Sequence, residues 1–246
     1  MATVYKQFNA NDKTTTRTLL HENIPVTGTI VSGTYGTFGA EENIKDYSHG
    51  MFQSVYDYPY LSSSSNHIFD ITCGYSNSSA LSSSTNTDHT KKIAVYNQMA
   101  QVLAGHDISG SIRRFDENGD LTEGDKHDDV FFMNFSRLLT KDEIKKGTFS
   151  LTFMTGAYIT PDTDLINITD TGASTSFKTN SPAGEYGLLK KGSTNVGLLY
   201  YQAGVAVLTA SVLEGAVAGF SFDEPGHGVS GSLTGSSIQT NADNFR

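Results

Sequence analysis

The chain has no tryptophan and a single cysteine among its 246 residues. One cysteine excludes an intrachain disulfide framework and a zinc site built from several cysteines. Cys73 stands in the apolar run IFDITCGY, so we expect it to be a small buried hydrophobic residue. Without tryptophan, the aromatic core has to be built from the 12 Tyr and 14 Phe.

Charge is also scarce, at 17% of residues, and the formal net charge is −9. Lys and Arg form no cluster, which argues against a track for nucleic-acid phosphates. The N-terminus, MATVYKQFNANDK, lacks the basic segment and apolar segment of a secretory signal peptide. We therefore expect neither nucleic acid nor a membrane among the partners.

In place of charge the chain is rich in Ser, Thr, Asn and Gly, which favour strands, turns and long loops. We predict a mainly β fold, a sandwich or barrel-like α+β architecture. Its core domain spans residues 21–222. The polar segments 1–20 and 223–246 are too poor in apolar residues to form cores of their own, and we expect them to be extended arms.

The clearest local pattern lies at Val130–Thr155. Phe131, Met133 and Phe135 alternate with more polar neighbours, as on one face of a strand. A second strand is expected to follow Gly147. Between the two, Thr140 and Glu143 have the spacing of a capping box, which predicts a short helix near residues 141–146.

The most apolar window is 196–213, VGLLYYQAGVAVLTASVL. Its length is close to that of a membrane span, but Gly197, Gln202 and Gly204 interrupt it and Glu214 follows at once. Two apolar runs around a short Gly-containing loop are better explained by a buried β-hairpin.

Other segments are assigned by their periodicity and turn residues. Apolar residues recur at helical spacing over 91–104, with Gly105 at the end and Thr87 or Asp88 as possible caps. Strands are expected at 24–30 and 68–73, and a hairpin over 111–123. Flexible loop is expected at 77–90, surface loop at 33–40, and mostly loop at 156–195.

No segment has the pattern of a catalytic or cofactor site, and we expect no catalytic residues, no cofactor and no metal. The seven His are scattered and lack the HExxH spacing. Asp116, Asn118 and Asp120 have part of the spacing of a calcium loop, but Leu121 stands where glycine is needed and His127 where glutamate is needed. A weak cation site in this loop, with residues 125–129, remains an alternative.

Aromatic residues crowd the segment around Pro59. Tyr56, Tyr58 and Tyr60 precede a run of serines, a composition typical of contact surfaces, because tyrosine supplies large area at low entropic cost. These three residues form the candidate interaction surface. A core segment followed by a loop is an equally good interpretation.

Several long phrases resemble a family of virion structural proteins from T4-like marine phages, especially cyanophages. They are YSHGMFQSVYDYPYLSSSSNHIFDITCGYS, KKIAVYNQMAQVLAGHD, FFMNFSRLLTKDEIKKGTFSL and GLLYYQAGVAVLTAS. The similarity extends over most of residues 1–215. Members of this family continue with another β-rich segment, so the resemblance implies that a chain ending at Arg246 is a processed form or a shorter member.

The resemblance implies a non-enzymatic structural subunit of a contractile-tailed bacteriophage, in the tail, baseplate or neck. Its partners would be other virion proteins, in a homo-oligomer or ring assembled in the host cytoplasm. Three alternatives remain: a capsid or decoration protein of the same virion, a receptor- or glycan-binding module of a tail fibre, or a tail-associated hydrolase. The sequence does not indicate the symmetry or the neighbours.

Overall fold

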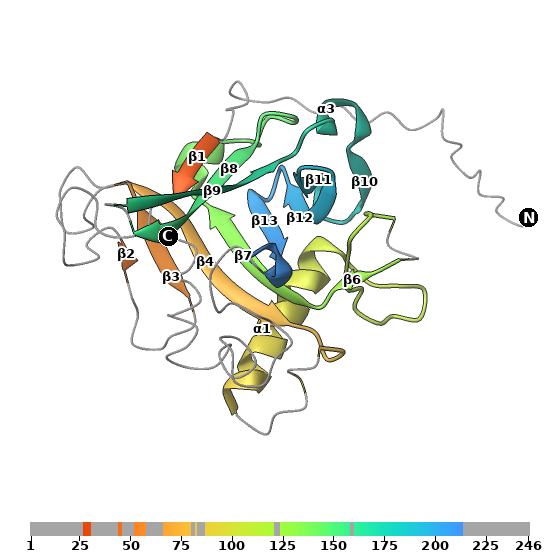
Figure 1. Cartoon of the computed structure of the whole chain (residues 1–246). Coiled ribbons are helices and arrows are strands. Elements are labelled where there is room, and N and C mark those ends of the chain that lie inside the picture. The colour runs from red at the N-terminus through yellow and green to blue at the C-terminus, as the bar shows by residue number, and fades with distance from the viewer. Residues whose placement is uncertain are drawn as a thin grey trace, which may run out of the picture.

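The structure is a computed structural model, and it describes residues 27–30, 44–45, 52–57, 66–79, 82, 87–120, 124–157 and 160–213. The predicted arms 1–20 and 223–246 and the predicted surface loop 33–40 lie outside these residues. Figure 1 shows most of the described strands in one curled sheet.

Strands dominate the described part of the chain. Among the described residues, eleven strands form one sheet and two form a separate ladder. In chain order they are β1 (Thr27–Ile30), β2 (Ile44–Lys45), β3 (Gln53–Tyr56), β4 (His67–Tyr75), β5 (Phe115–Asp116), β6 (Lys126–His127), β7 (Asp129–Phe135), β8 (Ser150–Ala157), β9 (Thr160–Thr169), β10 (Lys178–Ser181), β11 (Gly184–Lys191), β12 (Thr194–Tyr200) and β13 (Val205–Thr209).

Helices are few over the same ranges. They are α1 (Thr87–Leu103), α2 (Arg137–Thr140), α3 (Ala173–Ser176) and a 3₁₀ turn, η3 (Ala210–Leu213). The prediction of a mainly β fold is confirmed.

The strand order of the large sheet is β1-β8-β9-β11-β12-β13-β7-β4-β3-β2, with β10 beside β11. Within the described sheet, all pairs are antiparallel except β1 with β8. The last described strand in sequence, β13, lies between β12 and β7. It therefore joins the group of β2, β3, β4 and β7 to the group of β8, β9, β11 and β12.

The centre of the sheet is buried on both faces. In β7, Phe131, Met133 and Phe135 belong to one core cluster, while Val130 and Phe132 belong to another on the opposite face. Strands β12 and β13 alternate in the same way. Because both faces are covered, these strands are nearly continuous runs of apolar residues.

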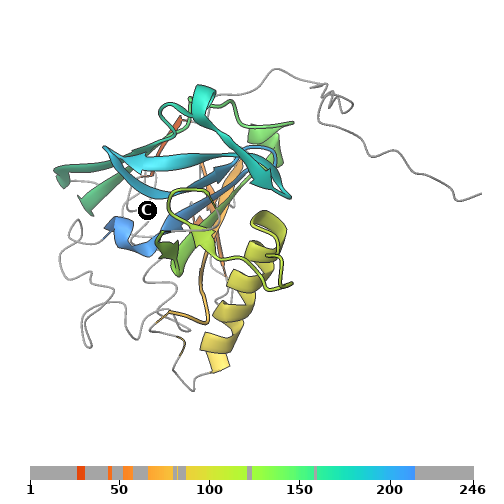
Figure 2. The ribbon, with the colours of Figure 1, turned by 90° about the vertical axis from the view of Figure 1, so that its right-hand side faces the viewer.

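Helix α1 covers one of the two faces (Figure 2). Tyr96, Ala100 and Leu103 recur at helical spacing and are buried against the same cluster as Phe132. Gly105, with a φ of 80°, follows the helix end, as predicted. The helix begins at Thr87 rather than near residue 91, so the last part of the predicted flexible loop is helical.

The apolar window 196–213 contains most of a hairpin, as predicted. β12 pairs with β13 through Gly197↔Leu208 to Tyr200↔Val205. None of the described helices is both long enough and apolar enough to span a membrane.

The predicted short helix near residues 141–146 is wrong. The helical turn is α2, four residues earlier, and its N-cap is Ser136, whose hydroxyl accepts from the Leu138 N–H at 3.3 Å. Lys141 has a φ of 48°, which ends the turn. Ile144 is fully buried, and its N–H donates to the Tyr201 carbonyl at 3.1 Å. This burial outweighs the local capping preference that the sequence contains.

The prediction that 156–195 is mostly loop is also wrong. This range contains β9, β10, β11 and the start of β12. β9 pairs with β8 along most of its length, and β11 pairs with β12 across a turn at Gly192. Asp, Thr, Gly, Ser and Pro in this range suggested loops, but in a sheet the backbone groups of such residues are satisfied by the neighbouring strand.

The hairpin predicted over 111–123 exists with a longer loop. β5 pairs with β6 through Phe115↔His127 and Asp116↔Lys126, so the return strand lies beyond residue 123. Gly119 has a φ of 71°, in agreement with a turn at Asn118-Gly119. The predicted strands at 68–73 and 24–30 correspond to β4 and, over its last four residues, β1.

Candidate functional site

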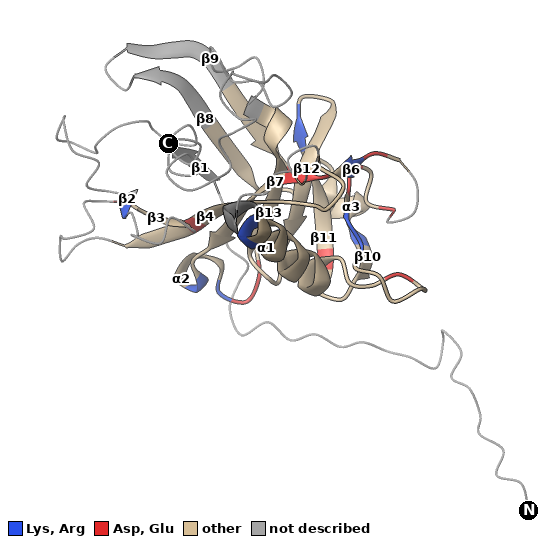
Figure 3. Cartoon of the chain, turned by 90° about the horizontal axis from the view of Figure 1, so that it is seen from below, with Lys and Arg blue, Asp and Glu red and all other residues tan. Residues whose placement is uncertain are grey.

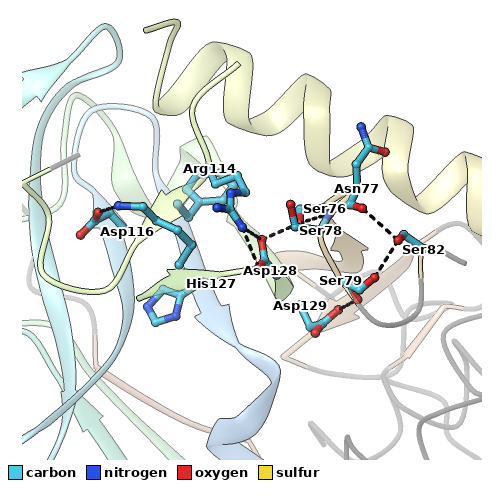
Figure 4. A network of polar contacts seen from close by, with 12 residues as sticks. Ser76, Asn77, Ser78, Ser79, Ser82, Arg114, Asp116, His127, Asp128 and Asp129 are labelled. Atoms are coloured by element: carbon cyan, nitrogen blue, oxygen red, sulfur yellow. Dashed lines mark hydrogen bonds and ion pairs between the residues drawn. The ribbon is translucent and has the colours of Figure 1, made fainter. Parts of the chain in front are cut away.

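A network of serines and carboxylates joins the end of β4 to the start of β7 (Figure 4). The Ser76 N–H donates to the Asp128 carbonyl at 2.8 Å, and the Ser76 hydroxyl donates to Asp128 Oδ1 at 2.5 Å. Arg114 Nη1 donates to both Asp128 carboxylate oxygens, at 3.0 and 2.9 Å. One carboxylate thus links three segments of the chain.

A second carboxylate orders the serine-rich turn after β4. The Ser79 hydroxyl donates to Asp129 Oδ1 at 2.5 Å. The Ser82 hydroxyl donates to the carbonyls of Asn77 and Ser79, at 2.9 and 2.7 Å. Residues 77–79 therefore form a hydrogen-bonded turn, which corrects the prediction that this stretch is flexible.

A serine, a histidine and an aspartate also meet on the neighbouring strands β3 and β4, but not in the order that a hydrolase needs. Ser54 Oγ and His67 Nε2 both lie against Asp70 Oδ1, at 2.5 and 2.8 Å. The carboxylate stands between the hydroxyl and the imidazole, whereas activation of serine requires the imidazole in the middle. This trio therefore has the arrangement of a structural hydrogen-bond network.

The partial calcium loop is held together by internal donors. Asp116 is fully buried, and its Oδ1 accepts from the N–H groups of Asn118 and Gly119, at 2.9 and 3.0 Å. Its Oδ2 forms an ion pair with Lys126. Within the described ranges, no three His, Cys, Asp or Glu side chains are grouped as metal ligands would be.

His127 belongs to the return strand of this hairpin, β6. It is buried, and its Nε2 has no hydrogen-bond partner. Burial lowers the pKa of His127 to about 4, against the smaller opposing effect of the Asp116 and Asp128 charges. The adjoining Tyr96 hydroxyl donates to the His127 carbonyl at 2.8 Å and accepts from the Phe115 N–H at 3.2 Å. The imidazole is therefore neutral and serves the packing of the hairpin.

Another buried carboxylate, Asp170, fixes the segment that leads into β8. Its oxygens accept from the N–H groups of Gly147 and Phe149, at 2.7 and 2.9 Å, and from the Tyr201 hydroxyl at 3.0 Å. Burial and the nearby Asp170 charge raise the pKa of Tyr201. This group also serves the fold.

The predicted interaction surface is only partly described. Tyr56 lies in β3, is half-buried, and meets the His67 ring edge-on with 5.4 Å between ring centroids. Tyr58 and Tyr60 lie outside the described residues. The structure therefore places Tyr56 beside His67 and does not test whether the three tyrosines form one surface.

Three exposed apolar side chains lie between residues 102 and 112, at and after the end of α1, and they were not predicted from the sequence. Val102 is 64% exposed, Ile112 is 36% exposed and Ile108 is fully exposed. We call these three residues the apolar knob. The signal was present in the sequence, because Ile108 is an isolated apolar residue in the polar loop GHDISGS.

The loop that carries Ile108 is fixed by its own hydrogen bonds. Asp107 Oδ1 accepts from the N–H groups of Ser109 and Ser111, at 2.8 and 2.9 Å, and from the Ser109 hydroxyl at 2.6 Å. These contacts lower the pKa of Asp107. The Arg113 N–H donates to the Gly105 carbonyl at 2.9 Å. Ile108 is thus held outward on an ordered loop.

Charged positions are distributed over the described chain. In Figure 3, Lys and Arg are scattered among several elements, and Asp and Glu lie among them. This distribution gives no continuous basic track along the described ribbon.

No model of a known protein family matches the chain, and comparisons with curated proteins and with solved structures find no significant match.

Proposed function

We propose that this chain is a non-enzymatic structural subunit of a contractile-tailed bacteriophage virion, assembling with other subunits in the tail, baseplate or neck. The observation that carries the proposal is the apolar knob. Ile108 is held fully exposed on a hydrogen-bonded loop. A neighbouring subunit that covers this side chain removes apolar surface from water, and this burial stabilises the contact between the two subunits.

The location of the family-like phrases supports the proposal. They contribute β3, β4, α1, β7, the start of β8, β12 and β13, which make up most of both core clusters. The resemblance therefore concerns the residues that build the core of the fold, and proteins with a shared architecture are expected to resemble one another at such residues.

The polar clusters support a structural role as well. Asp70, Asp116, Asp128 and Asp170 each accept hydrogen bonds from groups of the same chain. Carboxylates that accept hydrogen bonds from other segments of the same chain hold those segments together and so stabilise the fold.

Two other roles are compatible with this fold: a capsid or decoration protein, and a receptor- or glycan-binding module centred on Tyr56, Tyr58 and Tyr60. The first predicts a much higher copy number per particle than a baseplate component. The second predicts that soluble host glycans or receptor fragments bind the isolated chain, and that substitution of the tyrosines abolishes binding.

The decisive experiment is a cryo-electron microscopy map of the intact particle of the phage that encodes the chain. We expect the subunit in the tail, baseplate or neck, in a ring of sixfold or threefold multiplicity. Density for the chain on the capsid surface would favour the decoration role. Absence of the chain from purified particles would refute the proposal.

Substitution of the apolar knob tests its role directly. Ile108→Asp should change the free energy of unfolding by no more than about 0.5 kcal/mol, because the side chain is already exposed. It should nevertheless reduce incorporation into particles in complementation of a phage lacking the gene. Gln101→Asp, which adds the same charge at an exposed polar position of α1, is the control. Normal incorporation of Ile108→Asp would show that the knob is not an assembly contact.

A further inference from the structure

The pairing of β1 differs from every other pairing in the described sheet, because it alone is parallel. Thr27 to Ile30 lie beside Ser150 to Phe153 in β8, a segment far away in the sequence. Figure 1 shows this as a short red strand against the green β8. β1 is therefore the one described strand of this sheet that does not follow the antiparallel arrangement of the others.

β1 fills the edge of β8 that would otherwise be open. The other edge of β8 pairs with β9, and within the described residues β1 pairs with β8 alone. An edge left open would present a row of backbone N–H and C=O groups to other chains. β1 consists of four residues, and parallel pairing is slightly less stable per residue than antiparallel pairing.

The pairings of the described sheet permit exchange. Residues 31–43 separate β1 from β2 in the sequence. β1 and β2 stand at opposite ends of the strand order, so β1 shares no pairing with the strand that follows it in the described sheet. Among the described ladders, release of β1 breaks only the one to β8 and leaves the antiparallel part of the sheet paired.

We propose that β1 is an exchangeable strand: in the assembled form, residues 27–30 of one copy occupy the β8 edge of a neighbouring copy. The exchanged ladder has the same register and the same hydrogen bonds as the ladder within one chain. Exchange of an identical element is a low-cost route to association, because bonds lost in one chain are regained in the next. The inference rests on the proposed role as an assembling subunit, but not on its place in a particle.

The register supplies a test by disulfide trapping. Thr29 and Thr152 are directly paired, and Cα atoms of paired strands lie within the range that a disulfide can bridge. The native Cys73 is buried and stays the same in every variant. Full-length Thr29→Cys and Thr152→Cys chains with different tags are mixed at a concentration at which the wild-type chain sediments as an oligomer, and are then oxidised.

We expect a disulfide-linked heterodimer carrying both tags. The double variant Thr29→Cys/Thr152→Cys, oxidised at high dilution, should close within one chain. The background level of random disulfide formation between chains is measured with a mixture of Lys191→Cys and Thr194→Cys chains. These two positions pair across the tight β11–β12 turn, so the strands that carry them cannot exchange between copies.

Closure of the double variant without heterodimer above this background would overturn strand exchange, and the proposed function would stand as long as the wild-type chain still forms oligomers. Failure of the double variant to close would overturn the β1–β8 pairing and the exchange with it. A wild-type chain that remains monomeric, together with no heterodimer from the mixed Thr29→Cys and Thr152→Cys chains, would contradict both exchange and self-assembly.

Discussion

Gly197 in β12 lies against the backbone of β13. A Cβ built at this position would stand 2.1 Å from the Val207 carbonyl oxygen, which the strand holds in place. Gly197→Ala should therefore force the two central strands apart and destabilise the protein by about 3 kcal/mol or more. The free energy of unfolding in urea measures this effect.

Gly192→Ala is the matched comparison. Gly192 has a φ of 63°, and a Cβ added there would meet no described atom within 4 Å. The substitution therefore costs only backbone strain, about 1–2 kcal/mol. Equal losses for the two variants would contradict the close approach at Gly197.

His127 predicts a specific dependence of stability on pH. Its pKa is about 4 in the folded chain, below the ordinary value of 6.5. As the pH falls from 6.5 to 4, His127 becomes protonated in the unfolded chain but stays neutral in the folded chain, so the free energy of unfolding declines over this window. The full loss is about 3 kcal/mol at roughly 1.36 kcal/mol per unit.

Chemical denaturation of the wild-type chain and of His127→Gln across a pH range of about 4–7 measures this effect, because the variant lacks the titrating ring. The difference between the two stability curves isolates the histidine from the carboxylates that titrate nearby. A constant difference across the window would show that the ring is hydrated or paired.

Among the elements, α2 allows the observed N-cap, Ser136, to be compared with the N-cap predicted from the sequence, Thr140. Ser136→Ala should destabilise the protein by about 0.5–2 kcal/mol, the usual cost of losing an N-cap hydroxyl. Thr140→Val keeps the buried shape and loses only a long bond to the Ser136 carbonyl, at 3.4 Å, so it should cost less than about 1 kcal/mol. Thermal unfolding of both variants measures which substitution destabilises the protein more. A larger destabilisation by Thr140→Val would support the predicted capping box instead.

The elements that were predicted well from the sequence have periodic apolar residues on a buried face. The stripe of α1, the alternation in β7 and the two runs of β12 and β13 are of this kind. The strands from β9 to β11 were missed because their polar residues carry no such period, although each of them pairs with a strand next to it in the sequence.

The candidate site was harder to predict than the fold. Ser76 and Asp128 are brought together by the β4–β7 ladder, and Arg114 is placed beside Asp128 by the β5–β6 ladder. Single residues in the sequence give no sign of these contacts. Ile108 could have been noticed as an apolar residue in a polar loop. Its full exposure depends on the hydrogen bonds of Asp107.

For the whole molecule, composition predicts the behaviour of the arms. Residues 1–20 and 223–246 have too few apolar residues to offset the roughly 1–2 kcal/mol per residue that ordering a backbone costs. Limited proteolysis of the isolated chain should therefore leave a fragment of about residues 21–222, and the same chain in intact particles should be protected. Mass spectrometry of the fragments identifies the cut sites. Arms that resist protease in the isolated chain would belong to the subunit's own fold.

The position of β13 has a consequence for synthesis on the ribosome. The strands β2, β3, β4 and β7 form one group and β8, β9, β11 and β12 another, and β13 joins them. β13 is also the last strand in the described part of the chain. The two half-sheets therefore emerge with apolar faces that cannot be joined until residues 205–209 have been translated. The complete sheet forms only after that point, and a chain that terminates before Val205 is left with both half-sheets open to aggregation.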